Sequence, residues 1–170
     1  MVKTHQQDED SPFHISVGAV PVGPEGKILV HRRTKENTPE ELVGILNDLP
    51  EQYVLMHESL ENDESLESAV RRGLKEEFGA IGSVSNYIGS LQYMHTWSGR
   101  TFEKTILYYE AKITEMGERS ADDLEGFSEL FWAEPHFLIE KMNLQAEHSK
   151  NPRVSEAKII EAYLKYGKNP

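Results

Sequence analysis

The chain has 170 residues, no cysteine and a formal net charge of -11 at pH 7. This length suits a single domain, the acidic excess disfavours binding to long nucleic acids, and the lack of cysteine excludes disulfides and thiolate catalysis. No apolar run approaches the roughly 20 residues that a membrane span requires, so we expect a cytoplasmic protein with no membrane partner.

The N-terminal third predicts strands separated by turns. Residues 1–12 are polar and are expected to form a disordered tail. Residues 13–22 and 27–33 have strand composition and are joined by the turn sequence GPEG, which predicts a hairpin. Residues 34–50 are polar with two prolines, which favours a loop with at most a short helix over 39–46, and residues 52–58 (QYVLMHE) predict a third strand.

Residues 65–78 predict an amphipathic helix, because apolar side chains recur at spacings of three and four. These side chains are Leu66, Ala69, Val70 and Leu74. Asn62, Asp63 or Ser65 can cap the start of the helix and Gly79 can end it.

The rest of the chain predicts three strands followed by two helices. The strands cover residues 85–97, 103–113 and 128–133, and the helices cover 135–142 and 154–164. This order suits an α/β or α+β fold in which helices sandwich a mixed sheet, within one domain over residues 13–170.

The last turn of the predicted 65–78 helix places two carboxylates, Glu76 and Glu77, next to each other. Adjacent negative charges at the C-terminal end of a helix repel each other and oppose the helix dipole. A divalent cation would remove both penalties, and Mg²⁺ prefers a few carboxylates together with water and phosphate oxygens. A solvated helix surface is the alternative explanation of this pair.

Residues 58–80 (ESLENDESLESAVRRGLKEEFGA) resemble the Nudix box, G-x5-E-x7-R-E-U-x-E-E-x-G-U, where U is a bulky aliphatic residue. Six positions match at the required spacing: Glu64, Arg72, Leu74, Glu76, Glu77 and Gly79. The resemblance implies a Nudix-type fold, a Mg²⁺ cofactor with Mn²⁺ as an alternative, and metal ligands at Glu76 and Glu77. For Glu64 it implies a role either as a further metal ligand or in orienting Arg72. It also implies that Glu77 takes part in catalysis and that Arg72 and Gly79 are structural.

Three positions depart from the box. Glu58 stands where the first glycine belongs, Gly73 where the glutamate after the arginine belongs, and Ala80 where a larger aliphatic residue is usual. The resemblance implies that the missing glutamate would bind metal, so only two of three helix acids are retained. Gly73 therefore indicates either a loss of function or close packing of the helix against a neighbouring strand.

Other candidates lie outside the helix. The acidic stretch DDLEGFSELFW resembles a segment that precedes a late strand in Nudix proteins, and it suggests Glu125 as a catalytic base or extra ligand, with Glu129 as an alternative. Glu61 is a further substitute for the missing acid. In ILVHRR, Arg33 is the candidate for substrate phosphate, although a surface charge at the end of a strand explains it equally well.

These features predict a Mg²⁺-dependent hydrolase that cleaves the pyrophosphate bond of a nucleoside diphosphate linked to another moiety. A catalytically weakened nucleotide-binding or regulatory module with the same fold is the alternative, and a domain without a ligand is a third. The expected partner is the small-molecule nucleotide substrate, and a homodimer stays open.

Overall fold

The computed structural model describes residues 12–61 and 63–167, so all of the predicted tail except Pro12 lies outside the described residues. It has the following elements in chain order: β1 (Phe13–Val22), η1 (Pro24–Gly26), β2 (Ile28–Thr34), η2 (Glu40–Leu46), β3 (Glu51–Val54), β4 (His57–Ser59), α1 (Leu66–Phe78), β5 (Ala80–Trp97), β6 (Arg100–Met116), β7 (Glu129–Ala133), α2 (Pro135–Glu147) and α3 (Ala157–Tyr166).

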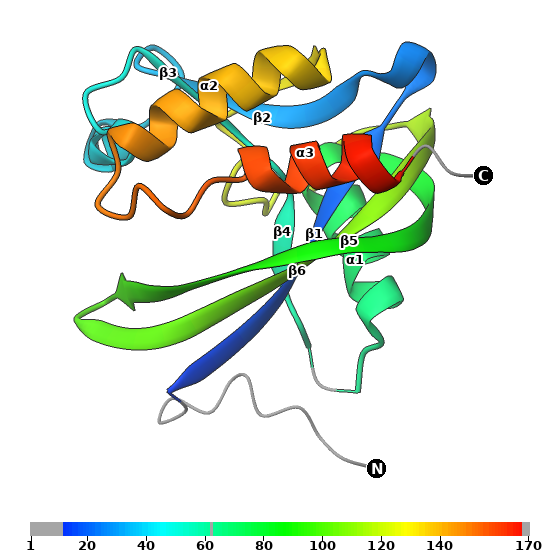
Figure 1. Ribbon diagram of the computed structural model, residues 1–170, viewed down its shortest axis with the longest axis horizontal. Coiled ribbons are helices and arrows are strands. Elements are labelled where there is room, and N and C mark those ends of the chain that lie inside the picture. The colour runs from blue at the N-terminus through cyan, green and yellow to red at the C-terminus, as the bar shows by residue number, and fades with distance from the viewer. Residues whose placement is uncertain (1–11, 62, 168–170) are drawn as a thin grey trace.

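The strands form one mixed sheet with the path β3-β2-β1-β6-β5, to which β4 adds beside β1 and β7 beside β2. The parallel pair is β1 with β6, which runs from Phe13 opposite Glu103 to Val22 opposite Lys112. The predicted first hairpin is present, but β1 and β2 pair only where Val22 faces Ile28. β1 pairs with β6 along its whole length and with β4 at Ser16, Val17 and Gly18, near its middle (Figure 1).

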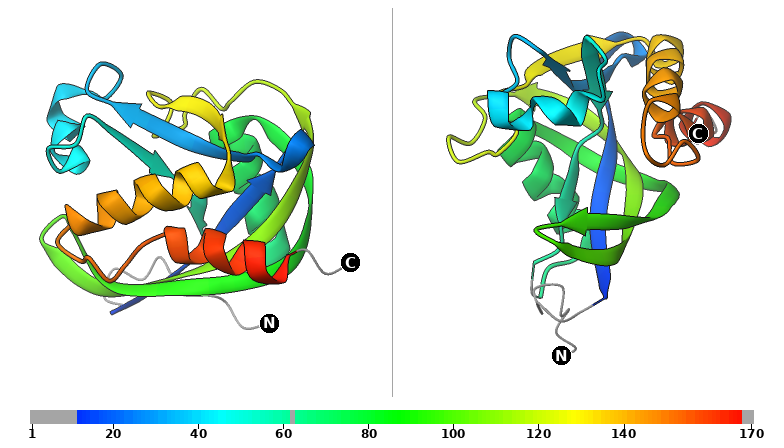
Figure 2. Two further views of the ribbon diagram at one scale, coloured as in Figure 1. Left: turned by 45° about the horizontal axis from the view of Figure 1, so that its top comes forward. Right: turned by 90° about the vertical axis from the view of Figure 1, so that its left-hand side faces the viewer.

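Helices cover the sheet on two sides, with α1 on one side and α2 and α3 on the other (Figure 2). The alternation of side chains along β2 explains why both sides are apolar: Ile28 and Val30 pack toward α2 and α3, whereas Leu29 packs toward α1. Two hydrophobic cores result. The α1 core also contains Val70, Leu74 and Phe78, which the 3.6-residue period places on one helix face.

Several elements differ in extent from their prediction. The 52–58 strand is broken at Leu55 and Met56 into β3 and β4, and the 39–46 helix is the 3-10 helix η2. Strands β5 and β6 extend further than composition indicates, because they form one long antiparallel ribbon in which each strand supplies the partner of the other.

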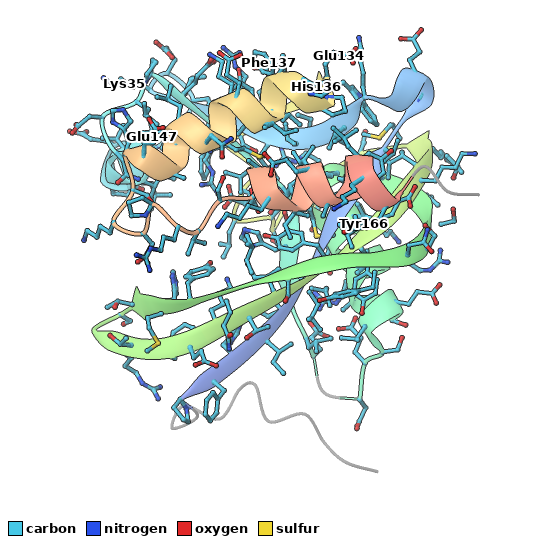
Figure 3. The ribbon with its side chains drawn as sticks, in the orientation of Figure 1. Lys35, Glu134, His136, Phe137, Glu147 and Tyr166 are labelled. Carbon is cyan, nitrogen blue, oxygen red and sulfur yellow. The ribbon has the colours of Figure 1, made fainter. Side chains whose placement is uncertain are left out.

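Helix α2 has polar residues at the surface near its two ends and apolar residues toward the core. Figure 3 labels His136 and Glu147, both exposed, near its two ends, while Leu138, Met142 and Ala146 face the core. Among the described residues, no helix is long and apolar enough to cross a membrane.

Candidate active site

Helix α1 is fixed at both ends by local interactions. The Ser65 hydroxyl accepts a hydrogen bond from the Ser68 amide at 3.1 Å, which satisfies one of the free amides of the first turn. Gly79 ends the helix with a φ of 63°, a conformation that glycine adopts without a Cβ penalty. The last turn therefore presents Glu76 and Glu77 in a defined position.

The loop after β6 is bound to this end of α1. The Gly117 amide donates to the Gly79 carbonyl at 2.7 Å, and the Ser120 amide donates to the Glu76 carbonyl at 3.0 Å. A Cβ at Gly79 would lie 2.5 Å from the Gly117 carbonyl oxygen, so this close approach also requires glycine.

Arg119 gives the same loop its shape. Its guanidinium donates to the Ser128 carbonyl at 2.7 Å, to the Glu125 carbonyl at 2.7 Å and to the Asp123 carboxylate at 3.0 Å. These bonds hold Asp123 and Glu125 beside the last turn of α1. Acids far apart in the sequence are thereby gathered at one site.

A pocket of about 480 Å³ lies between α1, this loop and the sheet. Its lining comprises Ser16, His57, Glu58, Ser59, Glu76, Glu77, Lys104, Ser120, Asp122, Asp123, Leu124 and Glu125. Carboxylates predominate, and Lys104 is the one lysine or arginine among the described residues that line it. The pocket thus has an acidic wall and one cationic group, and Lys104 was not singled out by its sequence context.

Glu77 is buried and bonded to His31, with 2.7 Å between Glu77 Oε2 and His31 Nε2. Burial, followed by the charges of Glu58, Asp123 and Glu125, raises the pKa of Glu77 well above its usual range. Burial also lowers the pKa of His31 to about 2.

The surrounding hydrogen bonds indicate where the proton of this pair lies. The Ser128 hydroxyl lies 2.8 Å from the Glu125 carbonyl and 2.7 Å from His31 Nδ1, and when it donates to the carbonyl it accepts from His31 Nδ1. His31 Nε2 is then the acceptor, and the protonated Glu77 carboxyl is its donor. In this arrangement Glu77 is protonated, which agrees with the rise in its pKa on burial.

The other predicted ligands have different surroundings. Glu76 lines the pocket with its side chain 45% exposed, and one of its oxygens is 3.5 Å from Arg72 Nη1. Glu64 is not part of the pocket lining; it accepts from Arg72 Nε at 2.9 Å and from Nη2 at 3.0 Å. These bonds lower the pKa of Glu64. Arg72 also donates to the Ser59 carbonyl at 2.8 Å and so ties α1 to the end of β4.

Arg33 and Glu125 form an ion pair. Arg33 Nε donates to Glu125 Oε2 at 3.1 Å, and Arg33 Nη2 donates to Glu125 Oε1. Glu125 lines the pocket, whereas Arg33 is not among its lining residues. Glu129, the sequence alternative to Glu125, instead accepts from Arg32 at 2.8 Å. Glu61 is exposed and is likewise not a lining residue.

Two of the three positions that depart from the box, Glu58 and Gly73, meet in space. A Cβ built at Gly73 would lie 3.0 Å from the Cβ of Glu58 and 2.7 Å from Met56 Sδ. Gly73 is thus the point at which α1 packs closely against the segment leading through β4. Close packing, one of the two explanations of this glycine, is what the structure displays.

A second group of polar side chains lies next to the pocket, around Glu156. Its carboxylate accepts from the Leu55 amide at 2.9 Å and from the Tyr108 hydroxyl at 2.7 Å, and it lies 4.0 Å from His57 Nε2. Burial raises the pKa of Glu156 to about 7 and lowers that of His57 to about 3.

Sequence reasoning left His31, His57 and Asp123 without a role. His31 had a usable signal, because the strand period places it on the same face as Arg33. His57 and Asp123 had no such signal. The pairing of β4 with β1 brings His57 to the site, and the hydrogen bond from Arg119 brings Asp123 there.

Carboxylate oxygens are the ligands that Mg²⁺ prefers, so the donor chemistry of the pocket fits a hard divalent cation. Across residues 12–61 and 63–167, however, no three Asp, Glu or His side chains are already arranged to hold a metal ion. Glu77 and Glu125 are instead bonded to His31 and Arg33. Cation binding would therefore have to replace protein contacts.

Known proteins with a similar fold were found among solved structures. The chain has 19% identity to the MutT protein from Methanosarcina mazei Go1, covering 94% of this chain and 99% of that one with a TM-score of 0.60. It has 18% identity to a NUDIX hydrolase from Nitrosomonas europaea, with 92% and 90% coverage and a TM-score of 0.59. The E. coli ORF135 protein is 19% identical, with 93% coverage of both chains and a TM-score of 0.56.

No curated protein matches the chain. The model of the NUDIX domain family matches residues 12–154, which include every element from β1 to α2 and all the residues of the box. The predicted fold, a mixed sheet between helices, is confirmed. The chain belongs to the Nudix family.

Proposed function

We propose that this protein is a Mg²⁺-dependent hydrolase that cleaves the pyrophosphate bond of a nucleoside diphosphate linked to another moiety. Family membership supports a pyrophosphohydrolase of nucleoside diphosphate derivatives in general. The metal dependence and the substrate class in this proposal rest on one observation, namely that Glu76, Glu77 and Lys104 line the same pocket. Such a pocket can hold a diphosphate through a divalent cation bound by the carboxylates and through the Lys104 ammonium group.

Within this pocket, Glu76 and Glu77 would hold the cation, which supplies Lewis-acid polarisation of the diphosphate when bound. His31 fixes the orientation of Glu77, and Lys104 would bind a phosphate oxygen. Glu125, held by Arg33, is the proposed acceptor of the proton from the attacking water. The water oxygen bonds to phosphorus as the bridging phosphorus–oxygen bond breaks, which gives two monophosphate products.

Arg33 has a different part in this proposal from the one its sequence context indicated. Its guanidinium is engaged by Glu125, so its contribution would be to position that carboxylate. Direct phosphate contact is assigned to Lys104, which lines the pocket. A homodimer stays a prediction.

A hydrolysis assay tests the proposal. The purified protein is incubated with a panel of nucleoside diphosphate derivatives and Mg²⁺ or Mn²⁺, and the products are separated by chromatography. We expect metal-dependent release of a nucleoside monophosphate that chelator abolishes and that Glu77→Gln lowers by at least about a hundredfold. The absence of turnover across the panel would contradict the proposal.

A second candidate function is a catalytically weakened nucleotide-binding or regulatory module. It is favoured by Gly73, which leaves α1 without one carboxylate, and by the lack of a ready-made group of three donors among the described residues. Calorimetric binding of a nucleoside diphosphate derivative by a protein that does not hydrolyse it would support this candidate instead.

A further inference from the structure

We infer that Glu58 supplies the metal-binding carboxylate that α1 lacks at Gly73, so that two of the three departures from the box are one exchange of residues between neighbouring positions. The inference rests on the proposed function only in assuming that the pocket binds a divalent cation. Among the proposed ligands, Glu58 would be the one contributed by β4.

The first observation is spatial. The box has glycine where this chain has Glu58 and glutamate where it has Gly73, and these positions are 15 residues apart in the chain. In the structure they touch, because the Cβ of Glu58 is 3.0 Å from the place where a Cβ at Gly73 would be. The Glu58 side chain therefore occupies space next to the Cβ position from which a glutamate side chain at position 73 would extend.

The second observation is that the carboxylate is directed into the same site. Glu58 lines the pocket together with Glu76 and Glu77, and its charge is one of those that act on Glu77. Its Oε1 accepts from the Ser59 amide at 2.9 Å, and its Oε2 is 3.5 Å from Arg72 Nη1. The contact of Oε2 with the Arg72 guanidinium is long, so Oε2 can give up this contact and bind a metal ion instead.

The third observation is the position of Glu58 on a strand. Residue 58 pairs with Val17 of β1, and Arg72 binds the carbonyl of the next residue, Ser59, at 2.8 Å. Both contacts fix the backbone from which the carboxylate extends. A metal ligand at position 58 therefore extends from a backbone that is held in place, as a ligand on α1 would.

Manganese binding tests the inference, measured by titration of free Mn²⁺ through electron paramagnetic resonance or by calorimetry. Glu58→Gln keeps the size and the acceptor for the Ser59 amide but removes the negative charge. Glu61→Gln is the matched control, because Glu61 Oε1 is also near Arg72 Nη1, at 3.7 Å, but Glu61 is exposed and does not line the pocket. We expect Glu58→Gln to raise the Mn²⁺ Kd at least tenfold and Glu61→Gln to change it less than about threefold.

The reciprocal variant, Glu58→Gly combined with Gly73→Glu, provides a second measurement. Removing the Glu58 side chain clears one of the two close contacts at position 73, and the other is with Met56, an unbranched side chain that can adopt another rotamer. We expect this double variant to bind Mn²⁺ at least fivefold more tightly than Glu58→Gln. Thermal unfolding confirms that each variant is folded.

The outcomes separate this inference from the proposed function. Equal Mn²⁺ affinity in the wild type and Glu58→Gln overturns the role of Glu58, even if hydrolysis is observed. Mn²⁺ binding that depends on Glu58 but not on Glu61, without hydrolysis of any substrate, supports the exchange and contradicts the hydrolase. A wild type that binds no Mn²⁺ overturns the inference. If the double variant is unfolded, the comparison of Glu58→Gln with Glu61→Gln decides.

Discussion

Glu77 Oε2 and His31 Nε2 lie 2.7 Å apart in a buried hydrogen bond, and burial favours the neutral form of both groups. When the Ser128 hydroxyl donates to the Glu125 carbonyl and accepts from His31 Nδ1, the proton shared by the pair lies on Glu77. A neutral Glu77 is compatible with the fold, whereas metal binding requires its ionised form. A substitution of Glu77 that keeps the hydrogen bond to His31 but cannot ionise should therefore impair metal binding without a matching loss of stability.

For Glu77→Gln, we expect a free energy of unfolding within about 1 kcal/mol of the wild type at pH 7, because the amide NH₂ can donate to His31 in place of the carboxyl group. We expect Mn²⁺ affinity to fall at least tenfold, because the amide cannot become a carboxylate. Chemical denaturation and Mn²⁺ titration measure the two quantities. Glu76→Gln, at a half-exposed position, is the control for stability. A loss of several kcal/mol in Glu77→Gln would mean that Glu77 is ionised in the fold.

Gly73→Ala should destabilise the protein by about 1–3 kcal/mol, the usual cost of overpacking. The new methyl group would lie 2.7 Å from Met56 Sδ and 3.0 Å from the Glu58 Cβ, which its strand backbone fixes, and the two contacts together outweigh the advantage of about 1 kcal/mol that alanine has over glycine in a helix. Gly44→Ala is the matched control, because a Cβ there has nothing within 4 Å. Urea denaturation compares them. A more stable Gly73→Ala protein would show that position 73 has room for a side chain.

Lys104→Met should raise KM for a nucleoside diphosphate substrate about tenfold or more, because it removes a charged donor from the pocket while keeping the apolar length of the side chain. The same change at Lys112, which is exposed on the same strand, should leave KM within about twofold. Steady-state kinetics at saturating Mg²⁺ distinguishes them. Equal KM values for the two variants would remove Lys104 from the binding site.

The buried Glu156 should make stability depend on pH. Burial raises its pKa to about 7 in the folded protein from an ordinary value near 4.5. The folded state therefore binds more protons than the unfolded state between these values, so the contribution of Glu156 to stability is lost progressively as pH rises from about 4.5 to about 7 and is constant above that.

Glu156→Gln removes this dependence and keeps an acceptor for the Leu55 amide. We expect the variant to gain stability relative to the wild type as pH rises across this interval, by on the order of 1–3 kcal/mol at pH 8. Thermal and urea unfolding at pH 4.5, 6, 7 and 8 measure the difference. A difference that is the same at all four values would show that Glu156 titrates normally in the fold.

Local patterns were sufficient for the helix that carries the box. The spacing of Ala69, Val70 and Leu74 requires one apolar face, Ser65 can cap only a helix that starts after it, and Gly79 favours an end there. Each depends on residues within a few positions of one another, so the sequence alone locates Glu76 and Glu77 on the last turn.

The same sequence could not place the groups that these acids meet. His31 reaches Glu77 because β2 lies beneath α1, and Asp123 and Glu125 reach it because Arg119 folds the loop after β6. His31 and Glu77 are 46 positions apart, and the Arg119 contacts lie in an irregular loop. Neither kind of contact leaves a periodic pattern in the sequence from which it could be predicted.

The chain by itself thus determined the family, the fold class and the two matching helix acids, because these depend on local periodicity and fixed spacing. Only the tertiary structure decided that Gly73 and Glu58 are neighbours, since their contact arises where α1 packs on the segment through β4. Two isolated departures from a sequence pattern become one physical relationship because a close helix–strand contact has room for a side chain from only one side.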